Sequence, residues 1–229
     1  MKKISLIAFI TALTLGSILA ANLNFGGFRL ININFGKIKG TGTAKSESRD
    51  VSGFKAIKVR GALNIEVVAQ KDFSISVEAD DNLLEHIKTE IDNGTLEIWS
   101  EGRISPRTSI KVKISMPEVD AVDIAGASNV VVSNVKSDSI RVEVRGASKV
   151  KIDGEATNLK SEASGASKID AENLVVENAE VEANGASKAI VQANNEIKAD
   201  ASGASKIYYS GNPKNIIEHS SGASSVKRK

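Results

Sequence analysis

The sequence predicts an all-β fold whose C-terminal half is a right-handed parallel β-helix, or β-solenoid, with rungs of about 19 residues. Three observations lead to this prediction. The tripeptide Gly-Ala-Ser occurs six times after residue 125, at a nearly constant spacing of 18 to 20 residues. Apolar and polar residues alternate on both sides of each copy, and the copies leave little room for long loops. A period near 20 residues is typical of a solenoid, and parallel crossovers are overwhelmingly right-handed.

Each copy of the tripeptide lies between two predicted strands. The residues two, four and six positions before the glycine are mainly apolar, as is the residue four positions after it, which is the period of a half-buried β-strand. Four positions after the glycine stand Val130, Val150, Ile169, Ala189, Ile207 and Val226. Two positions before it stand Ile124, Val144, Ala163, Ala183, Ala201 and Ser220. We therefore expect the core to become thinner towards the C-terminus.

The tripeptide itself is interpreted as the corner between the two strands. Glycine accepts the positive φ of a sharp bend, and alanine is small enough to stack on itself. We expect the serine hydroxyl to bond to the backbone or to the next serine. The corner residues to which we assign this structural role are Gly126, Ser128, Gly146, Ser148, Gly165, Ser167, Gly185, Ser187, Gly203, Ser205, Gly222 and Ser224. Gly61-Ala62-Leu63 resembles a degenerate copy, which would start the solenoid before Gly126.

Two columns of charged residues flank the predicted corner, three positions before and three positions after the glycine. The acidic column contains Glu143, Glu162, Glu182 and Asp200, and the basic column contains Lys149, Lys168, Lys188 and Lys206. Like charges about 4.8 Å apart repel by roughly 1 kcal/mol per pair in water, and an acidic ladder beside a basic one would offset this repulsion. The favoured interpretation is a solvated, charge-compensated surface. The alternative is a charged face that binds a repeating polymer such as a glycan.

The chain divides into four predicted segments. Residues 1–21 have the basic start, apolar run and small residues of a secretory signal peptide, which predicts export and no membrane span after cleavage. The alternative is an uncleaved membrane anchor. Residues 22–48 are a predicted flexible or strand-like connector, and in the strand-like case it would dock on a partner or a membrane surface. Residues 49–117 form a predicted N-terminal β unit with a hairpin at Asn93-Gly94, which caps the repeat of residues 118–229.

Several motifs of the chain match a known family in combination. They are Val51-Ser52-Gly53-Phe54-Lys55-Ala56-Ile57, Val77-Glu78-Ala79-Asp80-Asp81-Asn82-Leu83-Leu84, Asn93-Gly94-Thr95-Leu96-Glu97-Ile98 and the Gly-Ala-Ser rungs. Together they resemble the exported bacterial family called "putative auto-transporter adhesin, head GIN domain". The resemblance covers about Arg49 to Ser225 and implies a β-helix-like fold at the cell envelope or surface. It carries no catalytic motif, so it implies no catalytic residues, and a fold alone does not fix a function.

Composition excludes several classes of function. The chain has 30 basic and 28 acidic residues, and this balance argues against a dedicated nucleic-acid binder. It has no cysteine, which excludes thiol catalysis, disulfides and cysteine-ligated zinc. His86 and His219 are far apart in sequence and lack a metal-ligand spacing, and the sequence has no P-loop or hydrolase motif. We therefore predict no catalytic site, no cofactor and no metal.

The predicted function is that of an exported, non-enzymatic, adhesin-like β-solenoid. It would bind a surface glycan or an envelope protein in the periplasm, on the outer membrane or outside the cell. One alternative is a structural module that forms homo-oligomers by stacking its open C-terminal rung on another chain. A third is a carbohydrate lyase, although rungs of 18 to 20 residues leave little room for catalytic loops.

Overall fold

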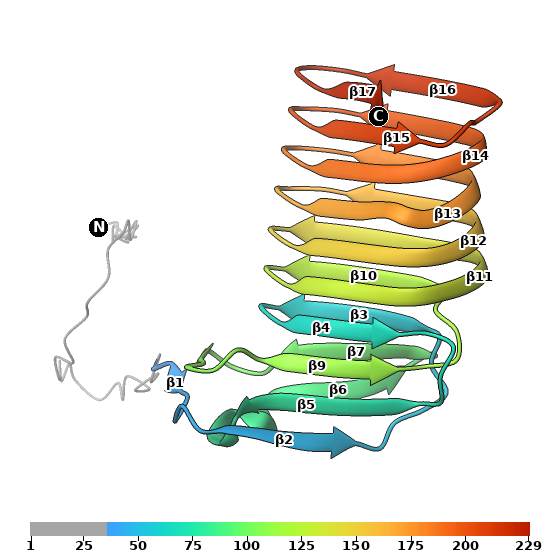
Figure 1. Cartoon of the computed structure of the whole chain (residues 1–229). Helices are drawn as coiled ribbons and strands as arrows, with labels where there is room; N and C mark the ends of the chain where they lie inside the picture. Colours follow the sequence, from blue (N-terminus) through green and yellow to red (C-terminus); the bar gives the residue numbers. More distant parts are fainter. Residues whose placement is uncertain (1–35) are drawn as a thin grey trace, which may run out of the picture. The chain divides into compact units, whose positions relative to one another are not determined.

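The computed structural model describes residues 36–229, and almost all regular structure in this part of the chain is β (Figure 1). Successive rungs are stacked in parallel and in register. The predicted all-β class and β-solenoid architecture are therefore confirmed. The predicted signal peptide and residues 22–35 of the predicted connector lie outside the described residues.

The Gly-Ala-Ser repeat forms one stack of strands. These are β10 (Ala121–Gly126), β11 (Asn129–Gly146), β12 (Lys149–Ala163), β13 (Lys168–Ala183), β14 (Lys188–Ala201), β15 (Lys206–Ser210), β16 (Asn215–Ser220) and β17 (Ser225–Arg228). The strand segments that lead into corner glycines form one layer, here called the entry layer. The segments that leave the corners form a second layer, the exit layer. Each of β11 to β14 begins in the exit layer and ends in the entry layer of the next corner.

The N-terminal unit continues both layers. Its elements are β2 (Ala44–Arg49), β3 (Ala56–Gly61), β4 (Asn64–Val68), β5 (Ser74–Asp80), β6 (Ile87–Asp92), β7 (Thr95–Ser100) and β9 (Lys111–Ser115). In the entry layer, β3 pairs with β10 and places Gly61 opposite Gly126, which confirms the degenerate copy of the corner. The same layer continues through β7 and then β6, which pair antiparallel through the predicted Asn93-Gly94 hairpin. In the exit layer, β4, β9, β5 and β2 follow in that order, and the last two pairings are antiparallel.

Residues 37–48 contain β1 (Ile38–Lys39) and most of β2. β2 pairs with β5 along its whole length, and β1 pairs with β8 (Ile104–Ser105). The side chains of β2 are almost all exposed, so its sequence lacks the apolar alternation that marks a strand. The backbone pairing of β2 with β5 therefore holds this strand in place.

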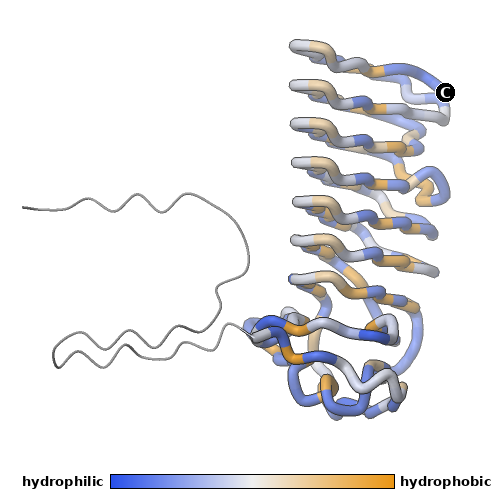
Figure 2. The backbone as a smooth tube through the Cα atoms, turned by 90° about the vertical axis from the view of Figure 1, so that its left-hand side faces the viewer, coloured by the Kyte–Doolittle hydropathy of each residue, from blue (hydrophilic) through white to orange (hydrophobic). Residues whose placement is uncertain are grey.

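The core lies between the two layers and changes in character along the stack. The largest fully buried side chains belong to residues 54–124 and include Phe54, Leu63 and Met116. Figure 2 shows apolar positions recurring at the same place in successive rungs. Towards the C-terminus the buried residue two positions before the corner is alanine, at Ala163, Ala183 and Ala201, as expected from the sequence, and all six residues of β16 are exposed.

Asp80 fastens the N-terminal end of the stack. Its side chain is completely buried and accepts hydrogen bonds from the backbone N–H groups of Gly42 at 2.7 Å, Arg107 at 2.8 Å and Thr108 at 3.2 Å. The carboxylate lies at the end of β5, just before the 3-10 helix η1 (Asp81–His86). A Cβ atom on Gly40 would lie 2.1 Å from Asp80 Oδ2, so the chain passes close over this carboxylate. Burial raises the pKa of the Asp80 carboxyl, but the three backbone donors outweigh it and hold the pKa below its ordinary value.

We expect acid to loosen residues 36–43. Because the folded pKa of Asp80 is lowered, its contribution to stability is present above the unfolded pKa of about 4 and is lost as the pH falls through the folded pKa. Hydrogen exchange of residues 36–43 should therefore accelerate in acid more than exchange in β12. Asp80→Asn should expose this segment at neutral pH and abolish the acid step, while Asp138→Asn, at an exposed position, should change neither. Unchanged exchange in Asp80→Asn would disprove the role of the carboxylate.

Candidate functional site

The corner residues stack in columns, and the corner serines form hydrogen bonds with the backbone of neighbouring rungs. The glycines have φ values from 74° at Gly203 to 113° at Gly126, as the sharp bend requires. The hydroxyls of Ser167, Ser187 and Ser205 donate to backbone carbonyls of the preceding rung at 3.0, 3.0 and 2.7 Å. The other corner serines are Ser128, which donates to the Gly61 carbonyl, Ser148, which accepts from the Ser128 N–H, and Ser224, which donates to the Ala201 carbonyl. The corner therefore offers a ligand few free polar groups.

The acidic column lies on the outer face of the entry layer. Glu143, Glu162, Glu182 and Asp200 pair in register on adjacent rungs. Glu143 is the most buried of them and is held by Arg141 and Arg145, its neighbours on the same strand. Burial raises the pKa of the Glu143 carboxyl, but the hydrogen bond from Arg141 and the charge of Arg145 outweigh it and hold the pKa low. Lys160 Nζ lies 2.7 Å from a carboxylate oxygen of Glu180, so this face neutralises much of its own charge.

The basic column lies on the outer face of the exit layer. Lys149, Lys168, Lys188 and Lys206 are aligned across four adjacent strands. Lys168 pairs with Asp170 at 2.7 Å, and the ammonium of Lys188 lies 4.7 Å from the centre of the Tyr208 ring. Among residues 36–229, Lys149, Lys188 and Lys206 form no ion pair with a carboxylate. The column therefore keeps most of its positive charge available.

The structure does not bring the two columns together. Between the acidic and the basic residue of each rung the chain turns through the corner, so the acidic column belongs to the entry layer and the basic column to the exit layer (Figure 1). No ion pair joins the two columns within the part of the chain that the structure describes. The charge-compensated surface expected from the sequence is therefore not formed by ion pairs between the two columns of residues 36–229. Each layer balances its charges with its own residues, and the exit layer does so less completely.

The exit layer carries further lysines outside the basic column, and some of them lie before the Gly-Ala-Ser repeat. In the exit layer, Lys111 and Lys113 of β9 lie opposite Asn64 and Glu66 of β4. Lys151 occupies the position beside Lys149 and pairs in register with Asp170. Lysines at alternate positions of residues 111–113 are visible in the sequence, but only the pairing of β9 with β4 shows that they share this face. We call the four-lysine column with its flanking Lys151 the lysine face.

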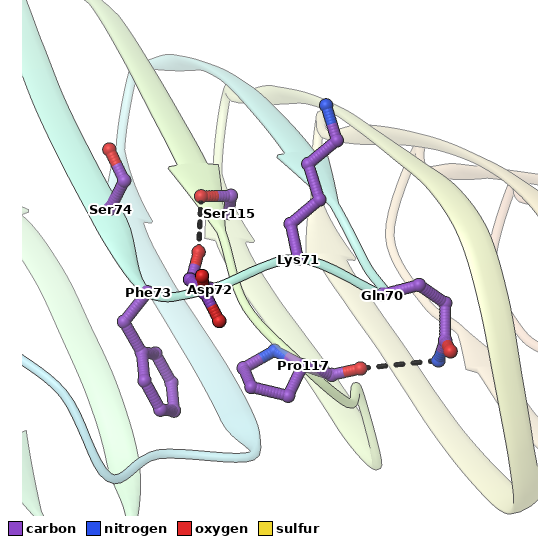
Figure 3. A pocket seen from close by; sticks show the side chains of 7 residues that line it. All are labelled: Gln70, Lys71, Asp72, Phe73, Ser74, Ser115 and Pro117. Atoms are coloured by element: carbon purple, nitrogen blue, oxygen red, sulfur yellow. Dashed lines mark hydrogen bonds between the residues drawn. The ribbon is translucent and has the colours of Figure 1, made fainter.

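A hollow of about 720 Å³ lies at the loop between β4 and β5 (Figure 3). Its walls include Gln70, Lys71, Asp72 and Ser115. The amide of Gln70 donates to the Pro117 carbonyl at 3.2 Å, and the Ser115 hydroxyl donates to the Asp72 carbonyl at 2.7 Å. Figure 3 shows the Lys71 side chain pointing away from Asp72 and Gln70. The lining therefore lacks the converging acid, base and nucleophile that catalysis requires.

Two further features bear on the predicted function. Residues 36–229 contain no group of three or more His, Cys, Asp or Glu side chains placed to hold a metal ion. The histidines stay far apart in the fold, since His86 ends η1 and His219 lies in β16. Within the same residues, no helix has the length and apolar character needed to cross a membrane.

Comparison with known proteins agrees with the fold. Residues 53–213 match the family model "Putative auto-transporter adhesin, head GIN domain". The chain is similar to a putative adhesin from Bacteroides fragilis, with 18% identity and a TM-score of 0.69, over 84% of this chain and 100% of that one. A putative adhesin and a putative lipid binding protein from Parabacteroides distasonis are each 20% identical, with TM-scores of 0.54 and 0.53. Both alignments cover 85% of this chain and 100% of the other. No curated protein matches the chain.

Proposed function

The chain belongs to the putative auto-transporter adhesin, head GIN domain family, and from this premise we propose that it is an exported, non-enzymatic protein that binds a linear anionic polymer through its lysine face. The observation that supports the proposal is the in-register column of Lys149, Lys168, Lys188 and Lys206. Strands about 4.8 Å apart give this column a regular spacing that a polymer with repeating charges can follow. The names of the similar proteins, as adhesins, agree with binding at a cell surface.

Electrostatics favours an anionic partner on this face. Aligned ammonium groups about 4.8 Å apart repel by roughly 1 kcal/mol per pair in water, and a polyanion lying along the stack relieves this repulsion. The acidic column belongs to the entry layer, and among residues 36–229 Lys168 is the one member of the four-lysine column that pairs with a carboxylate, that of Asp170. Binding of this kind weakens as salt is added, because exposed charges are screened beyond about 8–10 Å at physiological ionic strength.

The opposite layer makes the binding one-sided. Its outward acidic column would repel the same polymer, so a polyanion has only one sheet on which to lie. One-sided binding suits an adhesin-like module, because the other face remains free to point towards a second surface. A non-enzymatic role is consistent with the hollow between β4 and β5, whose lining does not assemble a catalytic set.

We expect the triple variant Lys149→Gln/Lys188→Gln/Lys206→Gln to lose at least about tenfold in affinity for polygalacturonate at low salt. These three lysines have no carboxylate partner within residues 36–229, so the substitution breaks no ion pair of this part of the fold. Isothermal titration calorimetry at two salt concentrations measures the affinity and its salt dependence.

The matched control is Lys71→Gln/Lys136→Gln/Lys214→Gln, which removes the same net charge away from the lysine face. We expect it to bind as the unsubstituted protein does. Equal losses in both triple variants would mean that only net charge matters, and no binding by the unsubstituted protein would disprove the polymer proposal.

A second candidate is assembly through β16, the last strand of the entry layer. Ile216 and Ile217 are 43% and 37% exposed, and β16 pairs with β14 at the end of the sheet. A terminal strand with exposed apolar residues favours pairing with another chain. Light scattering across a range of concentrations tests it, since a mass that stays monomeric throughout would contradict assembly.

A further inference from the structure

The single tryptophan of the chain lies on the outer face of the entry layer, away from the lysine face. Trp99 is in β7, where Leu96 and Ile98 point into the core and Trp99 points outward. Its register partners are Arg60 on β3 and Lys88 on β6. Most outward positions of this layer are polar, whereas Trp99 is a large aromatic residue. Because its side chain points away from the core, core packing does not explain its presence.

Trp99 forms one wall of a hollow of about 310 Å³. The other lining residues are Arg60, Gly61, Glu97 and Ser100. Gly61 keeps the hollow open, because a Cβ atom at this position would lie 3.3 Å from the Ser100 hydroxyl oxygen. The hollow therefore combines an aromatic wall with a backbone floor and polar groups at its rim.

The polar groups of the hollow are available to a ligand. Among residues 36–229, neither the indole N–H of Trp99 nor the hydroxyl of Ser100 has a hydrogen-bond partner. The guanidinium of Arg60 is 58% exposed and lies 3.8 Å from a carboxylate oxygen of Glu97, too far for a tight ion pair. In the described part of the chain no cation lies over the indole ring, so its face is not taken by Arg60 or Lys88.

The charges around the hollow are balanced. Glu97 is held by Lys58 at 2.7 Å, and Lys88 lies 3.1 Å from a carboxylate oxygen of Glu101. An anionic ligand would approach both glutamates, and a purely apolar ligand would bury the rim donors without hydrogen-bond partners, which is unfavourable. A neutral ligand with one apolar face and several hydroxyl groups satisfies both parts of the site.

We propose that the Trp99 hollow binds a neutral sugar ring of a glycan. The C–H face of a pyranose packs on the indole, and its hydroxyls accept from the indole N–H and Arg60 and exchange hydrogen bonds with Ser100. Aromatic side chains that pair an apolar face with a polar group serve as anchors in binding sites of this kind. This site lies on the opposite layer from the lysine face and does not depend on the anionic polymer proposed above.

Intrinsic fluorescence tests the proposal directly, because the chain has only one tryptophan. The full protein is titrated with cellohexaose, maltohexaose and chitohexaose, and emission and acrylamide quenching are recorded. We expect at least one of these sugars to shift the emission saturably and to protect Trp99 from acrylamide. Sugars that leave both signals unchanged, or a response only to polygalacturonate, would overturn the proposal.

Variants separate stacking from a general change in the protein. By calorimetry, Trp99→Ala should weaken binding of the responding sugar at least about tenfold, and Trp99→Phe should weaken it less. Tyr208→Ala removes an outward aromatic residue from the exit layer and should leave the Trp99 titration unchanged. Thermal unfolding confirms that each variant is folded. Undiminished binding by a folded Trp99→Ala variant, or loss of the fluorescence response in Tyr208→Ala, would contradict the assignment.

Discussion

Replacing Gly146 with alanine is expected to destabilise the protein by about 3 kcal/mol. The added Cβ would lie 2.5 Å from the Gly126 carbonyl oxygen and 3.1 Å from the Gly126 nitrogen. Both atoms belong to backbone that is fixed by pairing, since the Ala147 N–H donates to the same Gly126 carbonyl at 2.8 Å. Relief of the clash therefore requires two rungs to separate at their corner. The φ of 80° adds the strain of a left-handed conformation.

Gly102→Ala is the matched control for this substitution. Gly102 has nearly the same φ, 75°, but an added Cβ there would meet no atom of residues 36–229 within 4 Å. It should therefore cost only the conformational strain, about 1–2 kcal/mol. Urea unfolding followed by circular dichroism measures both variants. If they lose the same stability, the close approach between rungs is not the reason for glycine at the corner.

The solenoid could be predicted because each repeat contains the residues that produce the fold. A close backbone approach demands glycine at each corner, and alternating apolar residues fill the space between the layers, so both signals recur with one period. The corner glycine is present even where the Gly-Ala-Ser tripeptide is incomplete. Gly61 is followed by Ala62 and Leu63 instead of the full tripeptide, yet it occupies the same column as Gly126.

The arrangement of charge could be predicted only in part. The repeat shows which residues form a column, because that depends on their distance from the glycine. Which way a column faces depends on how far the corner turns the chain, and no single residue type encodes that angle. Glu143 and Lys149 were therefore expected side by side, whereas they lie on opposite layers and Glu143 is balanced by Arg141 and Arg145.

The remaining features depend on pairings between segments without a repeat. β2 is polar on both faces, and its order comes from backbone bonds to β5 and from the buried Asp80 beside it. Trp99 belongs to a hairpin strand that the sequence does identify. The hollow beside it exists only because β7 pairs with β3 and places Gly61 and Arg60 next to the indole.

Replacing Ser161 with valine is expected to stabilise the protein by about 1–3 kcal/mol. Ser161 is 1% exposed, and among residues 36–229 its hydroxyl has no hydrogen-bond partner. It stands between Val142 and Val181 in one column of the core, so two rungs already accommodate valine at this position. Valine removes the cost of the unsatisfied hydroxyl, adds buried apolar surface and favours the extended backbone of a strand.

Two comparisons separate the hydroxyl from the added volume. Ser161→Thr adds a methyl group but keeps the hydroxyl, so it should be less stable than Ser161→Val by about 1 kcal/mol or more in urea unfolding. Ser187→Ala should instead lower stability by about 1 kcal/mol, because that buried hydroxyl donates to the Ala163 carbonyl at 3.0 Å. If valine and threonine at position 161 prove equally stable, the hydroxyl carries no penalty. If both destabilise, the column has no room for the extra methyl group, and the small residues of the C-terminal core are required by the spacing of the layers.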